Sequence, residues 1–369
     1  MLSMLALAAA TLQAPSPLNC ERLALADLAC AQTPYGVVIG DDRAIADRFG
    51  LIMREGESRF RSQFGREPRP YAVLVGDRAN PVSESGSIGG GSVELQQRLR
   101  EAGAEHVQPW FTAEQRARLS ARSQRARIEA RARIDGLKGA ALAAAVEERM
   151  RSEPVPPTPE ADAGAAHELG HVWGVKVFWP QFDRRVAHQH YAGPGPDWLD
   201  ESVAVLLEDE AMAAGRRDEF RAQWTKAGGE RPKSLASYFV DPHPNAGMAS
   251  GARIMRAEDF PPGVLPSGPS TPGQTFTASG MNFARPANDP GRAGRMAMFY
   301  AQSRVLADFL LERSGDPGLY GRIATAVAGG ETMEQWIAAE GPGLRLGRSV
   351  AELERDWLDW LGRTYGPAG

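Results

Sequence analysis

One five-residue stretch limits the folds open to this chain more than any other part of it. His167 and His171 enclose Glu168 in the pattern His-Glu-x-x-His, after a segment of apolar, Ala-rich sequence. On an α-helix, residues four positions apart lie on the same face, one turn from each other. Both imidazoles can therefore reach one cation if the stretch is a buried helix, and a following element must complete the site.

The residue types of this motif point to one zinc ion. Imidazole nitrogens bind zinc at about 2.0–2.1 Å in tetrahedral geometry. Glu168 then points toward the open side of the metal, where its carboxylate can take a proton from water. The sequence predicts Zn²⁺ held by His167 and His171, with Glu168 as general base. The alternative is an amphipathic helix with two ordinary histidines, which the apolar sequence before the motif disfavours.

Catalytic zinc needs a third protein ligand, and two patterns follow the motif. The residues after His171 nearly complete the metzincin signature, but Val177 stands where that signature has its third histidine. Residues 198–204, Trp-Leu-Asp-Glu-Ser-Val-Ala, resemble the helix on which gluzincins carry a glutamate ligand. This resemblance implies that Glu201 is the third ligand.

Other side chains near this segment remain open as ligands. Asp200 and Asp197 are acidic alternatives to the glutamate, and both can bind zinc through oxygen. His188 and His190 lie in the connection between the two helices and are interpreted as exposed loop histidines.

The chain thus resembles gluzincin-type metallopeptidases of the peptidase-MA-like superfamily, loosely over residues 35–78 and better over 162–362. The resemblance implies a zincin-like α+β fold, with a small N-terminal α/β sheet part, the motif helix and a mostly helical C-terminal part. It also implies that Tyr300 hydrogen-bonds the tetrahedral intermediate, against the alternative of an ordinary packed tyrosine. The family's aspartate four residues past the glutamate ligand is replaced by Val205, so the group that orients the histidines is not indicated.

The expected function is therefore a zinc metallopeptidase that acts on a peptide or protein substrate. The first alternative is a zinc-stabilised binding protein without catalysis. The second is an envelope-associated interaction protein in which the long Arg/Ala-rich helix carries the function.

Composition excludes two classes of partner. The formal net charge is −4, with no basic excess of the kind that nucleic-acid binding requires. No apolar run reaches the roughly 18–20 residues that span a bilayer. We expect neither nucleic acid nor a membrane span, and the sequence carries no signal for the oligomeric state.

The N-terminus resembles an export signal. Residues 1–19 begin with small and apolar side chains but lack a basic start, and they predict a signal segment for periplasmic or extracellular export. Retention in the cytoplasm remains the alternative. In an exported protein Cys20 and Cys30 are expected to form a disulfide, and in a cytoplasmic one they are reduced thiols.

Residues 20–160 are predicted to form the N-terminal α/β part. Strands at 35–39 and 71–75 flank a helix capped by Asp41 or Asp42, and a helix at 93–102 and a strand at 107–111 follow. Residues 113–152 are rich in Ala, Arg and Glu and predict a long solvated helix or a helical hairpin. The predicted break in it is Gly136 or Gly139.

Residues 161–369 are predicted to form the zinc-binding and helical C-terminal part, after a proline-rich linker at 154–159. Asp162 is expected to cap the motif helix, and a second helix is expected from Asp197 to about Ala214. Residues 241–294 predict a long loop that gates or shapes the site. Helices dominate from Met296 onward, with capping boxes at Thr332…Gln335 and Ser349…Glu352.

Overall fold

The computed structural model describes residues 18–23, 25, 27–81, 93–153, 162–182, 190, 193–244, 275–278, 281–284 and 292–369. Most of the predicted signal segment, the linker at 154–159, His188 and most of the loop at 241–294 lie outside the described residues. Among the described residues, no helix is both long and apolar enough to cross a membrane.

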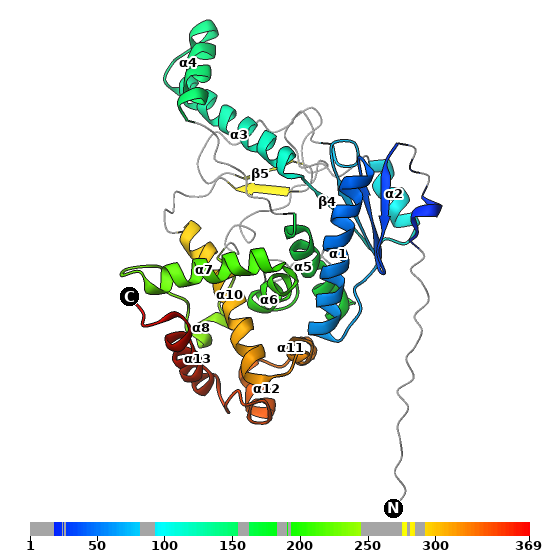
Figure 1. Ribbon diagram of the computed structural model, residues 1–369. Coiled ribbons are helices and arrows are strands. Elements are labelled where there is room, and N and C mark those ends of the chain that lie inside the picture. The colour runs from blue at the N-terminus through cyan, green and yellow to red at the C-terminus, as the bar shows by residue number, and fades with distance from the viewer. Residues whose placement is uncertain are drawn as a thin grey trace, which may run out of the picture.

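A four-stranded sheet forms the N-terminal part of the molecule (Figure 1). Its order is β1-β2-β3-β4, with β1 antiparallel to β2 and the other neighbours parallel. The strands are β1 (Ala29–Gln32), β2 (Gly36–Gly40), β3 (Tyr71–Val75) and β4 (His106–Trp110). The predicted β-α-β start is confirmed, whereas β1 had no predicted counterpart.

Helices cover both faces of this sheet. Because successive side chains of a strand point to opposite faces, Val37 and Ile39 of β2 join one apolar cluster and Val38 joins another. The first cluster includes Leu95 and Leu99 of α2 (Val93–Glu101). The second, larger cluster packs against α1 (Arg43–Phe64) and continues into the helical part of the molecule.

Local sequence signals set the limits of α1. Asp42, one of the two predicted caps, accepts a hydrogen bond from the backbone N–H of Ile45 at 2.9 Å. The helix ends at Gly65, whose φ of 60° is a left-handed conformation that glycine adopts without steric cost. Asp41 has a different role, because its carboxylate accepts backbone N–H groups of the turn after β3.

The predicted helical hairpin is present and projects from the rest of the molecule (Figure 1). It consists of α3 (Ala113–Ile134) and α4 (Gly139–Ser152). Gly136, one of the two predicted break positions, lies between the helices, and Gly139, the other, is the first residue of α4; their φ angles are 85° and 55°. The break therefore follows from glycine conformation.

The C-terminal part is mostly helical, as expected, so the chain as a whole has a mixed α and β fold. Its helices are α5 (Gly164–Phe178), α6 (Asp197–Leu207), α7 (Glu210–Thr225), α8 (Leu235–Tyr238), α10 (Arg292–Ser314), α11 (Leu319–Ala328), α12 (Met333–Glu340) and α13 (Val350–Tyr365). Two short strands, β5 (Thr275–Ala278) and β6 (Met281–Ala284), form a separate antiparallel pair.

The two predicted capping boxes have different outcomes. The Thr332…Gln335 box is complete, with both side chains bonded to the reciprocal backbone N–H groups. Ser349 caps α13 through the N–H of Glu352, but the Glu352 carboxylate accepts the N–H of Arg348 instead of closing the box.

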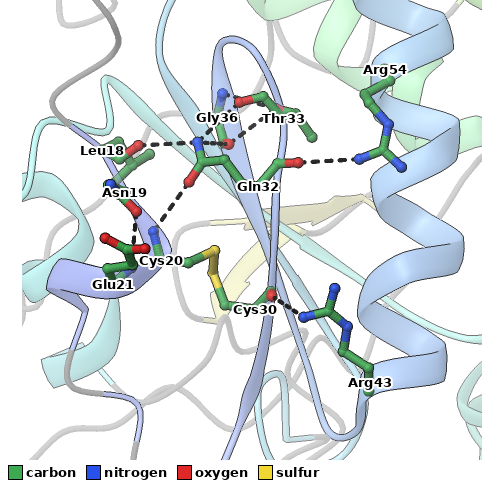
Figure 2. The surroundings of a disulfide bond; sticks show 10 residues. All are labelled: Leu18, Asn19, Cys20, Glu21, Cys30, Gln32, Thr33, Gly36, Arg43 and Arg54. Atoms are coloured by element: carbon green, nitrogen blue, oxygen red, sulfur yellow. Dashed lines mark hydrogen bonds between the residues drawn. A yellow bond between two sulfur atoms is a disulfide. The ribbon is translucent and has the colours of Figure 1, made fainter.

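A disulfide joins Cys20 and Cys30, the pairing expected for an exported protein (Figure 2). It links the short helical turn η1 (Cys20–Arg22) to β1. The side chain of Gln32 reinforces this link, because it accepts the N–H of Cys20 and donates to the carbonyl of Leu18.

Candidate metal centre

The motif helix α5 is buried along most of its length, as its sequence predicts. It lies between the sheet, α1 and α6, and its ten buried positions are almost all apolar or small. Asp162 does not cap it, which corrects the prediction. The N-cap is Ala163 without a side-chain bond, and the Asp162 carboxylate instead pairs with Arg48 at 3.1 Å and Arg116 at 3.6 Å.

Two glycines of α5 bring α6 unusually close. A Cβ atom on Gly170 would lie 2.9 Å from Cα of Ala204, a distance that real Cβ contacts essentially never show. A Cβ atom on Gly174 would lie 3.3 Å from Val203. At Gly170 only hydrogen allows the two helix backbones to approach this far, and at Gly174 a larger residue would press on the Val203 side chain. The same approach puts Glu201 opposite the two motif histidines.

Three predicted ligands meet at this helix contact. Oxygen or nitrogen atoms of His167, His171 and Glu201 all lie within 4.8 Å of one another. Glu201 Oε1 is 3.6 Å from Nε2 of His167, and its Oε2 is 3.9 Å from Nε2 of His171. Both histidines therefore turn the same nitrogen toward one carboxylate, and the group is able to hold a metal ion.

The chemistry of the donor set fits a cation. Glu201 is only 3% exposed, and its Oε1 atom has no hydrogen-bond partner among the described residues. Leaving a carboxylate oxygen buried without a partner is costly, and a cation at this point satisfies it. Tetrahedral bonds of about 2.1 Å separate ligand atoms by roughly 3.4 Å, close to the two observed distances.

Each histidine turns its other ring nitrogen toward a second carboxylate. Nδ1 of His171 is 2.8 Å from Oδ2 of Asp200, and Nδ1 of His167 is 3.0 Å from Oε1 of Glu208. The hydrogen bond between His171 and Asp200 is of the kind that fixes the ring orientation and the tautomer of a metal-binding histidine, and the Glu208 carboxylate lies at the corresponding nitrogen of His167. They leave both Nε2 atoms directed at the same point.

Asp200 thus contacts Nδ1 of His171, on the side of the ring that faces away from Glu201. It is not part of the group formed by His167, His171 and Glu201. Burial by itself lowers the pKa of His171, but the Asp200 carboxylate, helped by Glu201 and Glu168, raises it to about 10 in the metal-free protein. For the Glu201 carboxyl group, burial has the opposite effect and raises the pKa, although His167 and His171 act to lower it.

Glu208 was missed by the sequence prediction. It follows α6, which ends at Leu207 and does not continue to Ala214 as predicted, because Asp209 caps the next helix through the N–H of Met212. One signal was available: Glu208 lies seven residues after Glu201, on the same face of a helix. Identifying its contact with His167 requires the packing of α6 on α5.

Arg216 of α7 extends this arrangement. Its guanidinium contacts the fully buried Glu208 carboxylate at 2.8 Å and lies 5.0 Å from the centre of the Tyr300 ring. Burial alone would raise the pKa of Glu208, but His167 and Arg216 outweigh it and hold that pKa below its usual value.

Tyr300 lies beside the ligand group, although its place in the helix differs from the prediction. Helix α10 begins at Arg292, so Tyr300 is more than two turns into it instead of at its start. The Tyr300 ring centre is 6.4 Å from that of His167 and 5.8 Å from that of His243. His243, which the prediction also missed, is 4% exposed at the same place.

The remaining predicted residues are placed as follows. Glu168 is exposed on α5, next to His167 in sequence, and its charge acts on His171. Asp197 is buried at the start of α6, where it accepts the N–H of His243 at 2.7 Å and lies 4.0 Å from Nδ1 of His190. Val177 packs against the apolar core.

Comparisons with known proteins give no relative. No protein-family model matches the chain, and neither the curated proteins nor the solved structures contain a match to it.

Proposed function

We propose that this chain is a zinc-dependent metallopeptidase of the gluzincin type, with a zincin-like arrangement of its active-site helices. The observation that carries this proposal is the buried group of His167, His171 and Glu201, with the exposed carboxylate of Glu168 beside it. Two histidines and a glutamate are one of the ligand sets of catalytic zinc. Three protein ligands leave a coordination position for the reaction, whereas structural zinc sites use four.

The donor atoms favour zinc over other metals. Mg²⁺ and Ca²⁺ prefer sites made of oxygen, whereas two of the three ligand atoms here are imidazole nitrogens. A zinc ion held there supplies Lewis acidity, which polarises the scissile carbonyl group and makes water more acidic.

The residues of the chain divide the remaining work. Glu168 accepts a proton from the attacking water and passes it to the leaving amine. Tyr300, beside His167, donates a hydrogen bond to the carbonyl oxygen as negative charge develops on it. Asp200 and Glu208 hold the imidazoles in the orientation that the ligand group requires.

The test compares Glu168→Gln with the unchanged protein. Both are loaded with zinc, their metal content is measured by elemental analysis, and cleavage of a peptide mixture is followed by mass spectrometry. Removing a general base lowers the rate by about 10²–10⁴-fold, while the ligands and hence the zinc content stay intact. Glu94→Gln, an exposed glutamate on α2, is the matched control and retains full activity.

Two results would contradict the proposal in different ways. Full hydrolysis by Glu168→Gln removes Glu168 from the mechanism. If the unchanged chain binds zinc in an amount equal to that of the protein but cleaves no peptide of the mixture, the zinc-stabilised binding protein is favoured instead.

A further inference from the structure

The hairpin of α3 and α4 extends from the molecule and shares little of its core (Figure 1). Helix α3 has 22 residues and is therefore about 33 Å long. The buried apolar side chains of the hairpin are few: Ile128, Ala132 and Val146. Most of its surface faces solvent, so its sequence is free to serve a contact outside the chain.

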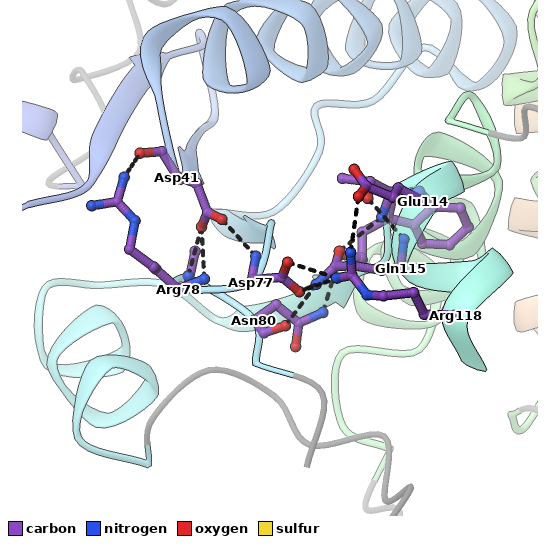
Figure 3. Close-up of polar contacts among 10 residues, drawn as sticks. Asp41, Asp77, Arg78, Asn80, Glu114, Gln115 and Arg118 are labelled. Atoms are coloured by element: carbon purple, nitrogen blue, oxygen red, sulfur yellow. Dashed lines mark hydrogen bonds and ion pairs between the residues drawn. The ribbon is translucent and has the colours of Figure 1, made fainter. Parts of the chain in front are cut away.

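Its base is nevertheless firmly attached to the sheet (Figure 3). The Gln115 side chain donates to Asp77 at 3.0 Å and to the carbonyl of Asn80 at 3.1 Å. Arg118 contacts both carboxylate oxygens of Asp77, at 2.5 and 2.6 Å. Thr112 and Gln115 form a complete capping box at the start of α3. The first turns of the hairpin are thus held in one direction.

The same base lies near the start of the helix that carries the motif, through Asp162 and through Trp110 of β4, whose ring centre is 5.8 Å from the Arg116 guanidinium. Arg116 of α3 pairs with Asp162, two residues before α5, at 3.6 Å. The ring of Trp110 packs against Gly164, the first residue of α5, where a Cβ atom would lie 3.0 Å from it. The base of the hairpin is thus connected to the segment that leads into α5.

The hairpin is basic in an acidic protein. Residues 113–153 hold ten Lys or Arg and six Asp or Glu, a net charge of +4, whereas the whole chain carries −4. Part of this charge is neutralised locally, by pairs such as Arg133 with Glu129 and Arg125 with Glu147.

In the part of the chain that the structure describes, four cations of the hairpin have no ion-pair partner, namely Arg122, Arg127, Arg131 and Lys138, and the last three lie toward its far end. Among the described residues, no carboxylate oxygen lies within 4.0 Å of the side-chain nitrogens of Arg127, Arg131 or Lys138. Arg127, Arg131 and Ile134 follow each other at spacings of four and three, so they share one face of α3. Ile134, the last residue of that helix, is 85% exposed. We call Arg127, Arg131, Ile134 and Lys138 the hairpin tip.

We propose that the hairpin tip docks on an anionic phospholipid surface, with Ile134 inserted among the headgroups and the three cations beside lipid phosphates. Cations attract anionic headgroups and an exposed apolar side chain can enter the interface, and these are the two attractions by which proteins bind anionic lipid surfaces. A protein partner is disfavoured because stable protein interfaces bury about 800 Å² on each side around an apolar centre, whereas Ile134 is the one exposed large apolar side chain among the described residues of the hairpin. Binding to an anionic lipid surface requires positive charge and an apolar side chain that can insert, and the hairpin tip has both.

The expected binding is weak and reversible. Each cation near an anionic leaflet strengthens binding about fivefold, and this contribution falls as salt screens the charges. Full burial of an isoleucine side chain adds about tenfold or more.

The test is sedimentation of the full chain with vesicles of phosphatidylcholine, with and without phosphatidylglycerol. The unchanged protein is expected to bind only the vesicles that contain phosphatidylglycerol. Arg127→Glu with Arg131→Glu lowers that binding at least 25-fold, and Ile134→Ser lowers it about tenfold. All these positions are exposed, so circular dichroism and the thermal midpoint should stay unchanged.

Helix α13 provides matched controls that change the same charge and the same apolar exposure elsewhere. They are Arg355→Glu with Arg363→Glu, and Leu358→Ser at a side chain that is 46% exposed. These variants retain full vesicle binding.

Three outcomes would overturn the proposal. In the first, the tip variants bind vesicles as well as the α13 controls do. In the second, the unchanged protein binds vesicles equally with and without phosphatidylglycerol. In the third, the tip variants change the sedimentation coefficient of the protein alone without changing vesicle binding, which assigns the tip to a contact between copies of the chain. None of these outcomes depends on zinc or on peptide hydrolysis.

Discussion

Glu208→Gln tests the arrangement around His167 more directly than a change of any ligand. The side chain of Glu208 is fully buried, 3.0 Å from Nδ1 of His167 and 2.8 Å from Arg216. Glutamine has the same shape and keeps one acceptor oxygen, but it removes the negative charge between two basic groups. The ligands themselves are untouched.

The magnitude follows from this position. Loss of an outer carboxylate that orients a metal-binding histidine lowers metal affinity by about 10–100-fold, which equals about 1.4–2.8 kcal/mol. Removing one partner of a buried ion pair also costs about 3–5 kcal/mol of folding free energy. Because glutamine retains a hydrogen bond to Arg216 and that side chain is 25% exposed, we expect the lower end of the folding cost.

The assay separates these two effects. Zinc affinity is measured by competition with a fluorescent chelator, and the stability of the metal-free protein is measured by urea denaturation. Glu210→Gln is the control, since Glu210 is an 80% exposed carboxylate on α7 that pairs with Arg217 and contacts no ligand. Its zinc affinity should equal that of the unchanged protein.

One result would refute the reasoning. If Glu208→Gln remains folded and binds zinc within about threefold of the Glu210→Gln control, the carboxylate does not orient His167 for metal. A loss of stability with unchanged affinity would make Glu208 a structural partner of Arg216 alone.

Two further changes test the packing and the charge of the core. Gly170→Ala should destabilise the protein by about 1–3 kcal/mol and lower zinc affinity by pushing α6 away, outweighing the gain of up to about 1 kcal/mol in helix propensity. Gly215→Ala, on α7 with no atom within 4 Å of the new Cβ, should instead raise the thermal midpoint; equal shifts would contradict the close-packing argument. Burial raises the pKa of Glu57, so the folded state holds that proton more tightly and stability falls as pH rises above the ordinary glutamate range. Glu57→Gln should remove this decline in urea titrations across pH, and parallel curves for the two proteins would show that Glu57 does not cause it.

Short-range sequence signals predicted many of the elements correctly. The residues from Asp42 to Gly65 define α1, and Gly136 and Gly139 lie at the turn of the hairpin, because caps and left-handed turns depend on residues a few positions apart. Strand β3 was predicted at its observed bounds, since both its faces are apolar. Strand β1 was missed because its four residues, Ala29–Gln32, include no β-branched or aromatic side chain.

The wrong predictions have two physical causes. Asp162 is a residue type that often caps helices, yet its carboxylate forms ion pairs with Arg48 and Arg116 from other helices. The helix predicted to continue to Ala214 ends at Leu207, where Asp209 caps α7 and Glu208 turns toward His167 and Arg216. A contact between distant segments overrides the local preference at Asp162, whereas α6 ends because the local cap at Asp209 starts a new helix.

For the metal centre, the sequence by itself determined that His167 and His171 share one helix face, because a spacing of four is one turn of any α-helix. Only the tertiary structure decided that Glu201 faces both Nε2 atoms, since this depends on how far Gly170 lets α6 approach α5. It also assigned Glu208 to His167, across 41 positions of sequence. Helix periodicity acts over one turn, whereas the position of one helix on another is set by packing that no local pattern encodes.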